Sequence, residues 1–137
     1  MQILALIAVG AAALLVLTFG VRYVLTPEFM PYQATVLGRP WSQLEPRLQI
    51  IIRGMLKVAG GGLLGYGVAL LWLLLPLHRG EAWAAWAALT MSFAALAPIL
   101  YTVVWLRRIE PSAKTPVIPS LTVLVLVVVG ATIFLVD

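Results

Sequence analysis

The side chains that could carry out acid–base or metal chemistry are few in this chain and lie far apart in the sequence. The 137 residues include one histidine and no cysteine, which excludes a thiolate nucleophile, a cysteine-ligated metal and a disulfide. His78 has no second histidine to help it hold a metal ion, and Ser92 has no histidine near it in sequence to act as a base. We therefore predict no catalytic residue, no metal site and no cofactor, and we expect that the protein is not an enzyme.

All the acidic residues fall in predicted loops or at predicted helix ends. They are Glu28, Glu45, Glu81, Glu110 and Asp137. A proton-coupled transporter usually holds an ionisable group near the centre of the membrane, and the sequence places no carboxylate at that depth. This distribution argues against proton-coupled transport.

Two cations one helical turn apart form the clearest candidate for a binding site. Arg53 and Lys57 lie on one face of a predicted helix, because residues four apart are neighbours on its surface. With Arg107 and Arg108 they are predicted to bind an anionic lipid headgroup or the acidic segment of a partner. The alternative left open is that both side chains extend to the membrane surface, where water solvates them.

A glycine-rich run follows these cations, Gly60-Gly61-Gly62-Leu63-Leu64-Gly65-Tyr66-Gly67. Glycines four apart let another helix approach closely inside a membrane, so Gly61 and Gly65 are predicted to be helix-packing residues. Three contacts stay open: another helix of the same bundle, a second copy of the chain, or a ligand beside a thin pocket wall. Gly130 is expected to matter less, and the Tyr66 hydroxyl needs a hydrogen-bonding partner at this depth.

The composition places the chain among integral membrane proteins. Hydrophobic residues make up 63% and charged residues 10% of the sequence, whereas a soluble domain carries about 25% charged residues. The predicted fold class is all-α, an integral membrane four-helix bundle, with a single transmembrane domain over residues 1–137. Its spans are expected at about 3–25, 54–75, 82–106 and 120–136, since about 20 apolar residues cross a bilayer.

Local sequence patterns predict several helix ends. Ser42 and Glu45 match a capping box, so an amphipathic cytoplasmic extension over about 42–53 is expected to precede the second span. That span should stop at Pro76, because proline cannot continue the hydrogen bonding of a helix interior. Ser120 is the expected cap of the fourth span.

The first connection, residues 26–41, is rich in prolines and aromatic side chains. The prolines make one continuous helix unfavourable, and amphipathic aromatic rings favour the headgroup layer of a membrane. We expect a connector that lies along the membrane surface. A lid that contacts a ligand is the alternative.

The basic residues predict the orientation. Of the 9 lysines and arginines, eight fall on the side of the two long connections, and Arg79 falls on the other. The positive-inside rule places both connections in the cytoplasm and both termini outside. The net charge of +4 is then explained by loops that face anionic lipid on the cytoplasmic side, and no nucleic-acid partner is expected.

One family resemblance is visible in the middle of the chain. Arg53, the glycine-rich run up to Gly67, a leucine run, a short charged turn and an alanine- and tryptophan-rich helix together resemble DoxX-like proteins. These are small four-helix bacterial membrane proteins, and the resemblance covers about half of the chain. It implies a compact bundle in the bacterial inner membrane, and it implies no catalytic residue.

The function expected from these patterns is binding. We predict a small non-catalytic membrane protein that serves as a binding or accessory subunit for another membrane component or for lipid. Its expected partners are membrane lipids and another membrane protein or a second copy of itself. The alternative is a component of a small-solute transporter or channel.

Overall fold

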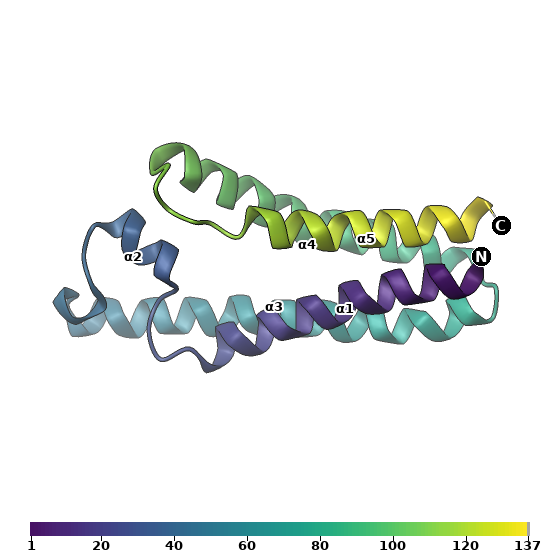
Figure 1. The fold of residues 1–137 in the computed structure, drawn as a ribbon. Coiled ribbons are helices and arrows are strands. Elements are labelled where there is room, and N and C mark those ends of the chain that lie inside the picture. The colour runs from purple at the N-terminus through teal and green to yellow at the C-terminus, as the bar shows by residue number, and fades with distance from the viewer. Residues whose placement is uncertain (137) are drawn as a thin grey trace.

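Four long helices dominate the computed structural model, which describes residues 1–136 (Figure 1). They are α1 (Gln2–Leu25), α3 (Pro46–His78), α4 (Ala82–Ile109) and α5 (Val117–Val136). A short helix, α2 (Pro31–Leu37), and a 3-10 turn, η1 (Trp41–Gln43), lie in the connection between α1 and α3. Each long helix is long and apolar enough to cross a membrane. The predicted all-α membrane bundle with four spans is confirmed at this level.

The four long helices form a ring in which α1 packs against α3 and α5, and α4 packs against α5 and α3. Figure 1 shows the N-terminus, the α3–α4 turn and the end of α5 at one end of the bundle, called here the terminal end. The α1–α3 and α4–α5 connections lie at the opposite end, called the connection end. Helix α3 has 33 residues and is about 50 Å long. It therefore extends beyond a hydrocarbon core of about 30 Å.

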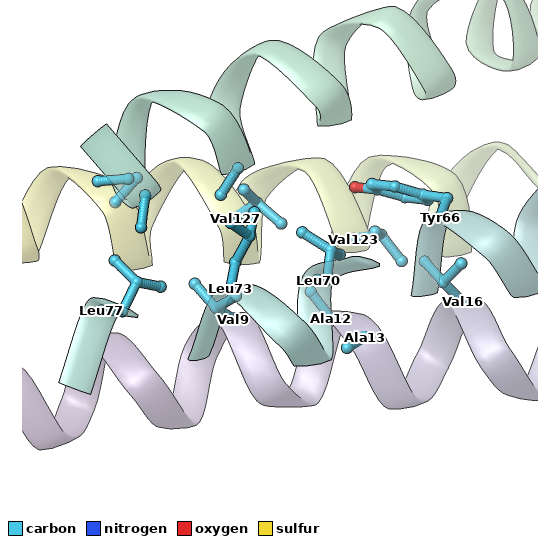
Figure 2. Packing of buried hydrophobic residues seen from close by; sticks show 14 of the residues in the cluster. Val9, Ala12, Ala13, Val16, Tyr66, Leu70, Leu73, Leu77, Val123 and Val127 are labelled. Atoms are coloured by element: carbon cyan, nitrogen blue, oxygen red, sulfur yellow. The ribbon is translucent and has the colours of Figure 1, made fainter. Parts of the chain in front are cut away.

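The core of the bundle is aliphatic and built at helical spacing (Figure 2). Leu70, Leu73 and Leu77 of α3 recur every three or four residues and point to the same side, as a core-facing stripe requires. They meet Val9 of α1 and Val127 of α5 within one buried cluster. Small alanines of α1 and α4 complete this cluster, which lets the helices approach closely.

Glycine does bring α1 and α3 together, but at positions other than the predicted pair. A Cβ added to Gly60 would lie 2.8 Å from the backbone nitrogen of Val24, and one added to Gly67 would lie 2.7 Å from Leu17. A Cβ at Gly61 or Gly65 would meet no atom of another described helix within 4 Å. The prediction that Gly61 and Gly65 pack inside the bundle is wrong. The packing glycines are seven residues apart, the repeat that keeps two helices in contact over several turns.

Gly130 is the second correction to the predicted packing. A Cβ at this position would lie 3.0 Å from the carbonyl oxygen of Ala5 and 3.0 Å from Val9. Gly130 therefore lies in the contact between α5 and α1, and it matters more than the valine-rich surroundings suggested.

Three helix ends differ from the predicted ones. Helix α3 begins at Pro46 with Glu45 as its N-cap, because proline suits the first helical position, where no intrahelical N–H bond is lost. Ser42 lies in η1 and does not cap α3. Helix α3 continues through Pro76 to His78. Helix α5 begins at Val117, so Ser120 lies inside it.

The side chain of Gln2 contacts the last turn of α3. Its amide nitrogen donates hydrogen bonds to the carbonyl oxygens of Leu77 and His78, both at 2.9 Å. These carbonyls belong to the last turn, where a helix leaves its acceptors unpaired. The α1–α3 pair is thereby fastened at the terminal end.

Candidate functional site

The connection between α1 and α3 is folded against α3 through a small second cluster. Phe29, Leu44 and Leu56 are buried there, and the ring of Phe29 meets that of Trp41 edge-on with 5.1 Å between centroids. Gly38 ends α2 with a φ of 62°, a left-handed conformation that glycine adopts without steric cost. The prediction that residues 26–41 do not form one continuous helix is confirmed, and α2 has a fixed place beside the bundle.

A cleft of about 720 Å³ opens at the connection end between α1, α2 and the α4–α5 connection. This volume lies within the range of about 300–1,000 Å³ that is common for small-molecule sites. The end of α1 forms one wall, α2 forms another, and residues 111–119 close the third side. The segment predicted to be a connector or a lid is therefore a wall of the largest described cleft.

Three cations from three separate elements line this cleft. They are Arg22 in the last turn of α1, Arg107 near the end of α4 and Lys114 in the α4–α5 connection. None of the described residues that line the cleft is acidic. The fold brings together charges that are more than ninety positions apart in sequence, and the cleft is a candidate site for an anion.

Glu110 is the acidic residue next to this wall in sequence, and it is held by Ser112. The carboxylate accepts hydrogen bonds from the hydroxyl and the backbone N–H of Ser112. These bonds hold the pKa of Glu110 below its usual range, so the carboxylate is ionised at neutral pH. The C-terminal ends of α1 and α4 add about half a negative charge each, and the N-terminal end of α5 adds about half a positive one. The three cations outweigh Glu110 and the two negative helix ends, so the surroundings of the cleft remain positive.

Two tyrosines join α1 to α2 at the wall of the cleft. The hydroxyl oxygens of Tyr23 and Tyr32 are 2.9 Å apart, and either can donate the hydrogen bond. Burial raises the pKa of the Tyr32 hydroxyl well above its usual range, and the hydrogen bond with Tyr23 raises it further. Tyr32 is therefore protonated at neutral pH.

The third side of the cleft contains a polar group without a partner in the described residues. Thr115 is 9% exposed, and its hydroxyl makes no hydrogen bond there. Its backbone is fixed by two tight turns, in which the N–H of Thr115 donates to Ala113 at 2.9 Å and the N–H of Val117 donates to Thr115 at 2.8 Å. A buried hydroxyl without a partner is unfavourable, but the oxygen of Thr115 is itself shielded from the cleft, so we assign it no contact with a ligand.

A smaller apolar cavity of about 60 Å³ lies directly behind the cleft. The two share Phe19, Tyr23, Pro116 and Pro119 as wall residues. The rest of its wall comes from all four long helices and is apolar except for one serine. Its members are Val16, Leu63, Leu96, Ile99, Val103, Ser120 and Val123.

The structure does not bring the four predicted cations into one site. The guanidinium carbon of Arg53 lies 5.3 Å from the centroid of the Trp41 ring, a cation–π arrangement outside the cleft. Lys57 is exposed, and it is absent from the residues that line the cleft, as is Arg108. Figure 1 shows the first turns of α3 well separated from the last turns of α4. Of the predicted set, Arg107 alone lines the cleft.

Sequence reasoning missed Arg22 and Lys114 as members of the site. The charge count placed both cations on the same side of the membrane as Arg107. It did not show that the end of α1 lies next to the α4–α5 connection. The contact between α1 and α5 brings these two segments together. The available sequence signal was weak: a single arginine at the end of an apolar run, and a lysine within a proline-rich connection.

Comparisons with known proteins add no identification. No protein-family model, curated protein or solved structure matches the chain, so the resemblance to DoxX-like proteins stays a prediction. Within residues 1–136, no three His, Cys, Asp or Glu side chains gather in a way that could hold a metal ion. The cleft with its three cations is the feature that carries the functional argument.

Proposed function

We propose that this protein is a non-catalytic membrane protein that binds an anionic, phosphate-bearing membrane component in the cleft at the connection end. The observation that carries the proposal is the convergence of Arg22, Arg107 and Lys114 on one cleft without an acidic wall residue. Arginine and lysine are the usual partners of phosphate oxygens, through paired N–H donors and through a point charge respectively.

The location of the cleft supports the same proposal. Eight of the nine basic residues belong to the connection end, which the positive-inside rule assigns to the cytoplasm. The cytoplasmic leaflet is the one whose anionic lipids attract basic segments. A headgroup at the depth where α1 and α4 end would meet the last-turn cations Arg22 and Arg107. The bound component is therefore proposed to come from the inner leaflet of the plasma membrane.

A headgroup comparison tests the proposal. The purified protein in a non-ionic detergent is titrated with dodecyl phosphate and with dodecylphosphocholine, which carry the same chain but differ in net charge. We expect tighter binding of dodecyl phosphate. The double variant Arg22→Gln/Lys114→Gln should lose about 2 kcal/mol of this binding, at about 1 kcal/mol for each basic residue near an anionic surface, which is roughly a 30-fold loss of affinity.

The variant Arg53→Gln/Lys57→Gln is the matched control, because it removes the same charge from the connection end but outside the cleft. It should reduce the affinity for dodecyl phosphate much less. Equal losses in the two double variants would mean that a diffuse positive surface attracts the anion, and the proposed site would be wrong.

A further inference from the structure

The apolar cavity behind the cleft indicates what kind of molecule the anion belongs to. We infer that the ligand is an amphiphile whose anionic headgroup occupies the cleft and whose apolar chain enters the bundle through the shared wall of Phe19, Tyr23, Pro116 and Pro119. This inference rests on the proposed function and names the ligand class of the same site. A free phosphate ion or a water-soluble phosphate ester would leave the cavity unused.

The size of the cavity decides how much of the ligand enters. Its volume is about 60 Å³, whereas a cavity of roughly 150 Å³ is known to admit a benzene ring. This volume suits a short length of one unbranched chain. A second chain, if the ligand has one, would have to stay outside the bundle among the surrounding lipids.

The polar groups are sorted along the path in the order that an amphiphile requires. Tyr23 contributes to both walls, and its hydroxyl is hydrogen-bonded to Tyr32. Arg22, Arg107 and Lys114 line the cleft and do not line the cavity. Ser120 lines the cavity, but its hydroxyl donates to the carbonyl of Pro116 at 2.8 Å. An entering chain therefore meets no unpaired hydroxyl in the described wall.

A pair of opposite changes at Leu63 tests the path. Leu63 lines the cavity and is only partly buried, so both a larger and a smaller side chain are expected to be tolerated. Leu63→Trp should reduce the affinity for dodecyl phosphate about tenfold, because about two methylene groups lose their burial. Leu63→Ala should not reduce it. Inorganic phosphate, which has no chain to place in the cavity, should bind the parent and both variants equally.

Leu74 offers the matched control on the same helix. It is also partly buried against the core and lines neither the cleft nor the cavity. Leu74→Trp should leave the affinity for dodecyl phosphate and for inorganic phosphate unchanged. If Leu63→Trp and Leu74→Trp weaken dodecyl phosphate equally, the effect comes from general disturbance of the bundle, and the inferred path is wrong.

Photocrosslinking locates the chain without relying on an affinity. A monoalkyl phosphate with a diazirine near the headgroup end of its chain should label wall residues of the cavity, such as Val103 or Leu96. Labelling confined to outward-facing residues such as Tyr101 would overturn the inference. It would leave the proposed function standing if Arg22→Gln/Lys114→Gln still weakened dodecyl phosphate. Loss of that charge effect would overturn the proposed function itself.

Discussion

At the scale of single residues, most hydroxyl groups of the long helices are satisfied by their own helix. Thr18, Thr90, Thr102 and Thr122 each donate to the carbonyl four residues earlier, and all four are exposed on the outside of the bundle. A transport path would need polar groups directed to the interior. These side chains give no support to that alternative, because they face outward and their donors are already used.

Tyr66 and Ser92 form a buried polar contact between α3 and α4. The Tyr66 hydroxyl donates to Ser92 at 2.6 Å, and the Ser92 hydroxyl donates to the carbonyl of Ala88 at 2.6 Å. Figure 2 shows Tyr66 beside the aliphatic core. The requirement for a partner was predictable from the sequence. The identity of the partner was not, because it depends on how α3 and α4 are aligned.

Removing the two members of this pair should have unequal effects on stability. Tyr66→Phe removes one interhelical hydrogen bond, which contributes about 0.6 kcal/mol on average in a membrane. Ser92→Ala leaves the Tyr66 hydroxyl buried without its partner, which costs about 1–3 kcal/mol. We therefore expect Ser92→Ala to lower the free energy of unfolding more than Tyr66→Phe, as measured by denaturation in mixed micelles. Thr102→Ala, on the outside of the bundle, is the control and should change the free energy of unfolding little. A larger loss of stability from Tyr66→Phe than from Ser92→Ala would contradict this account.

At the scale of the helices, the sequence predicted the number of spans correctly. It did not predict correctly which helix faces contact one another. Four apolar stretches of sufficient length determine four spans, whatever their neighbours are. The contact face of α3 was misjudged because Gly61 and Gly65 match a common packing motif, whereas Gly60 and Gly67 do not. All four glycines lie on one helix, and only the position of α1 distinguishes them. Leu17, Gly20 and Val24 of α1 lie against Gly67 and Gly60, and no local pattern in α3 contains that information.

Two adjacent glycines provide a direct test of the α1–α3 contact. Gly60→Ala places a methyl group 2.8 Å from Val24 and 2.9 Å from the carbonyl oxygen of Gly20, so the helices must separate. We expect a loss of about 1–3 kcal/mol, the usual effect of overpacking. Gly61→Ala meets no other described helix and should be neutral or stabilising by up to about 1 kcal/mol, since alanine favours a helix more than glycine does.

Unfolding of both variants in detergent, together with their elution volumes, distinguishes the possible outcomes. Equal stability of Gly60→Ala and the parent would contradict the close approach of α1 and α3. A change of oligomeric state in Gly61→Ala alone would show that this exposed face meets a second copy of the chain. Gly61 and Gly65 would then be packing residues between two copies and not within one bundle.

At the scale of the whole molecule, the asymmetry between the two ends links the fold to the proposed site. The sequence predicted that asymmetry from its charges alone. It could not predict the cleft, because the cleft is made by the end of α1, by α2 and by the α4–α5 connection, whose proximity depends on the contact between α1 and α5. A site of this kind is visible only after the ring order of the helices is known.

The orientation is the prediction on which the inner-leaflet source of the ligand depends. The chain has no cysteine, so single cysteines can be introduced without background. Arg39 at the connection end and Arg79 at the terminal end are both exposed, and together they report on the two sides of the membrane. We expect Arg79→Cys to react with a membrane-impermeant maleimide in intact cells, whereas Arg39→Cys should react only after the membrane is permeabilised. The physical reason is the eight-to-one distribution of basic residues, from which the positive-inside rule predicts that the connection end is cytoplasmic.

Permeabilised cells control for the intrinsic reactivity of each thiol, because both variants should then be labelled. The reverse pattern in intact cells would place the cleft on the outer side, and an anionic component of the outer leaflet would have to replace the inner-leaflet ligand.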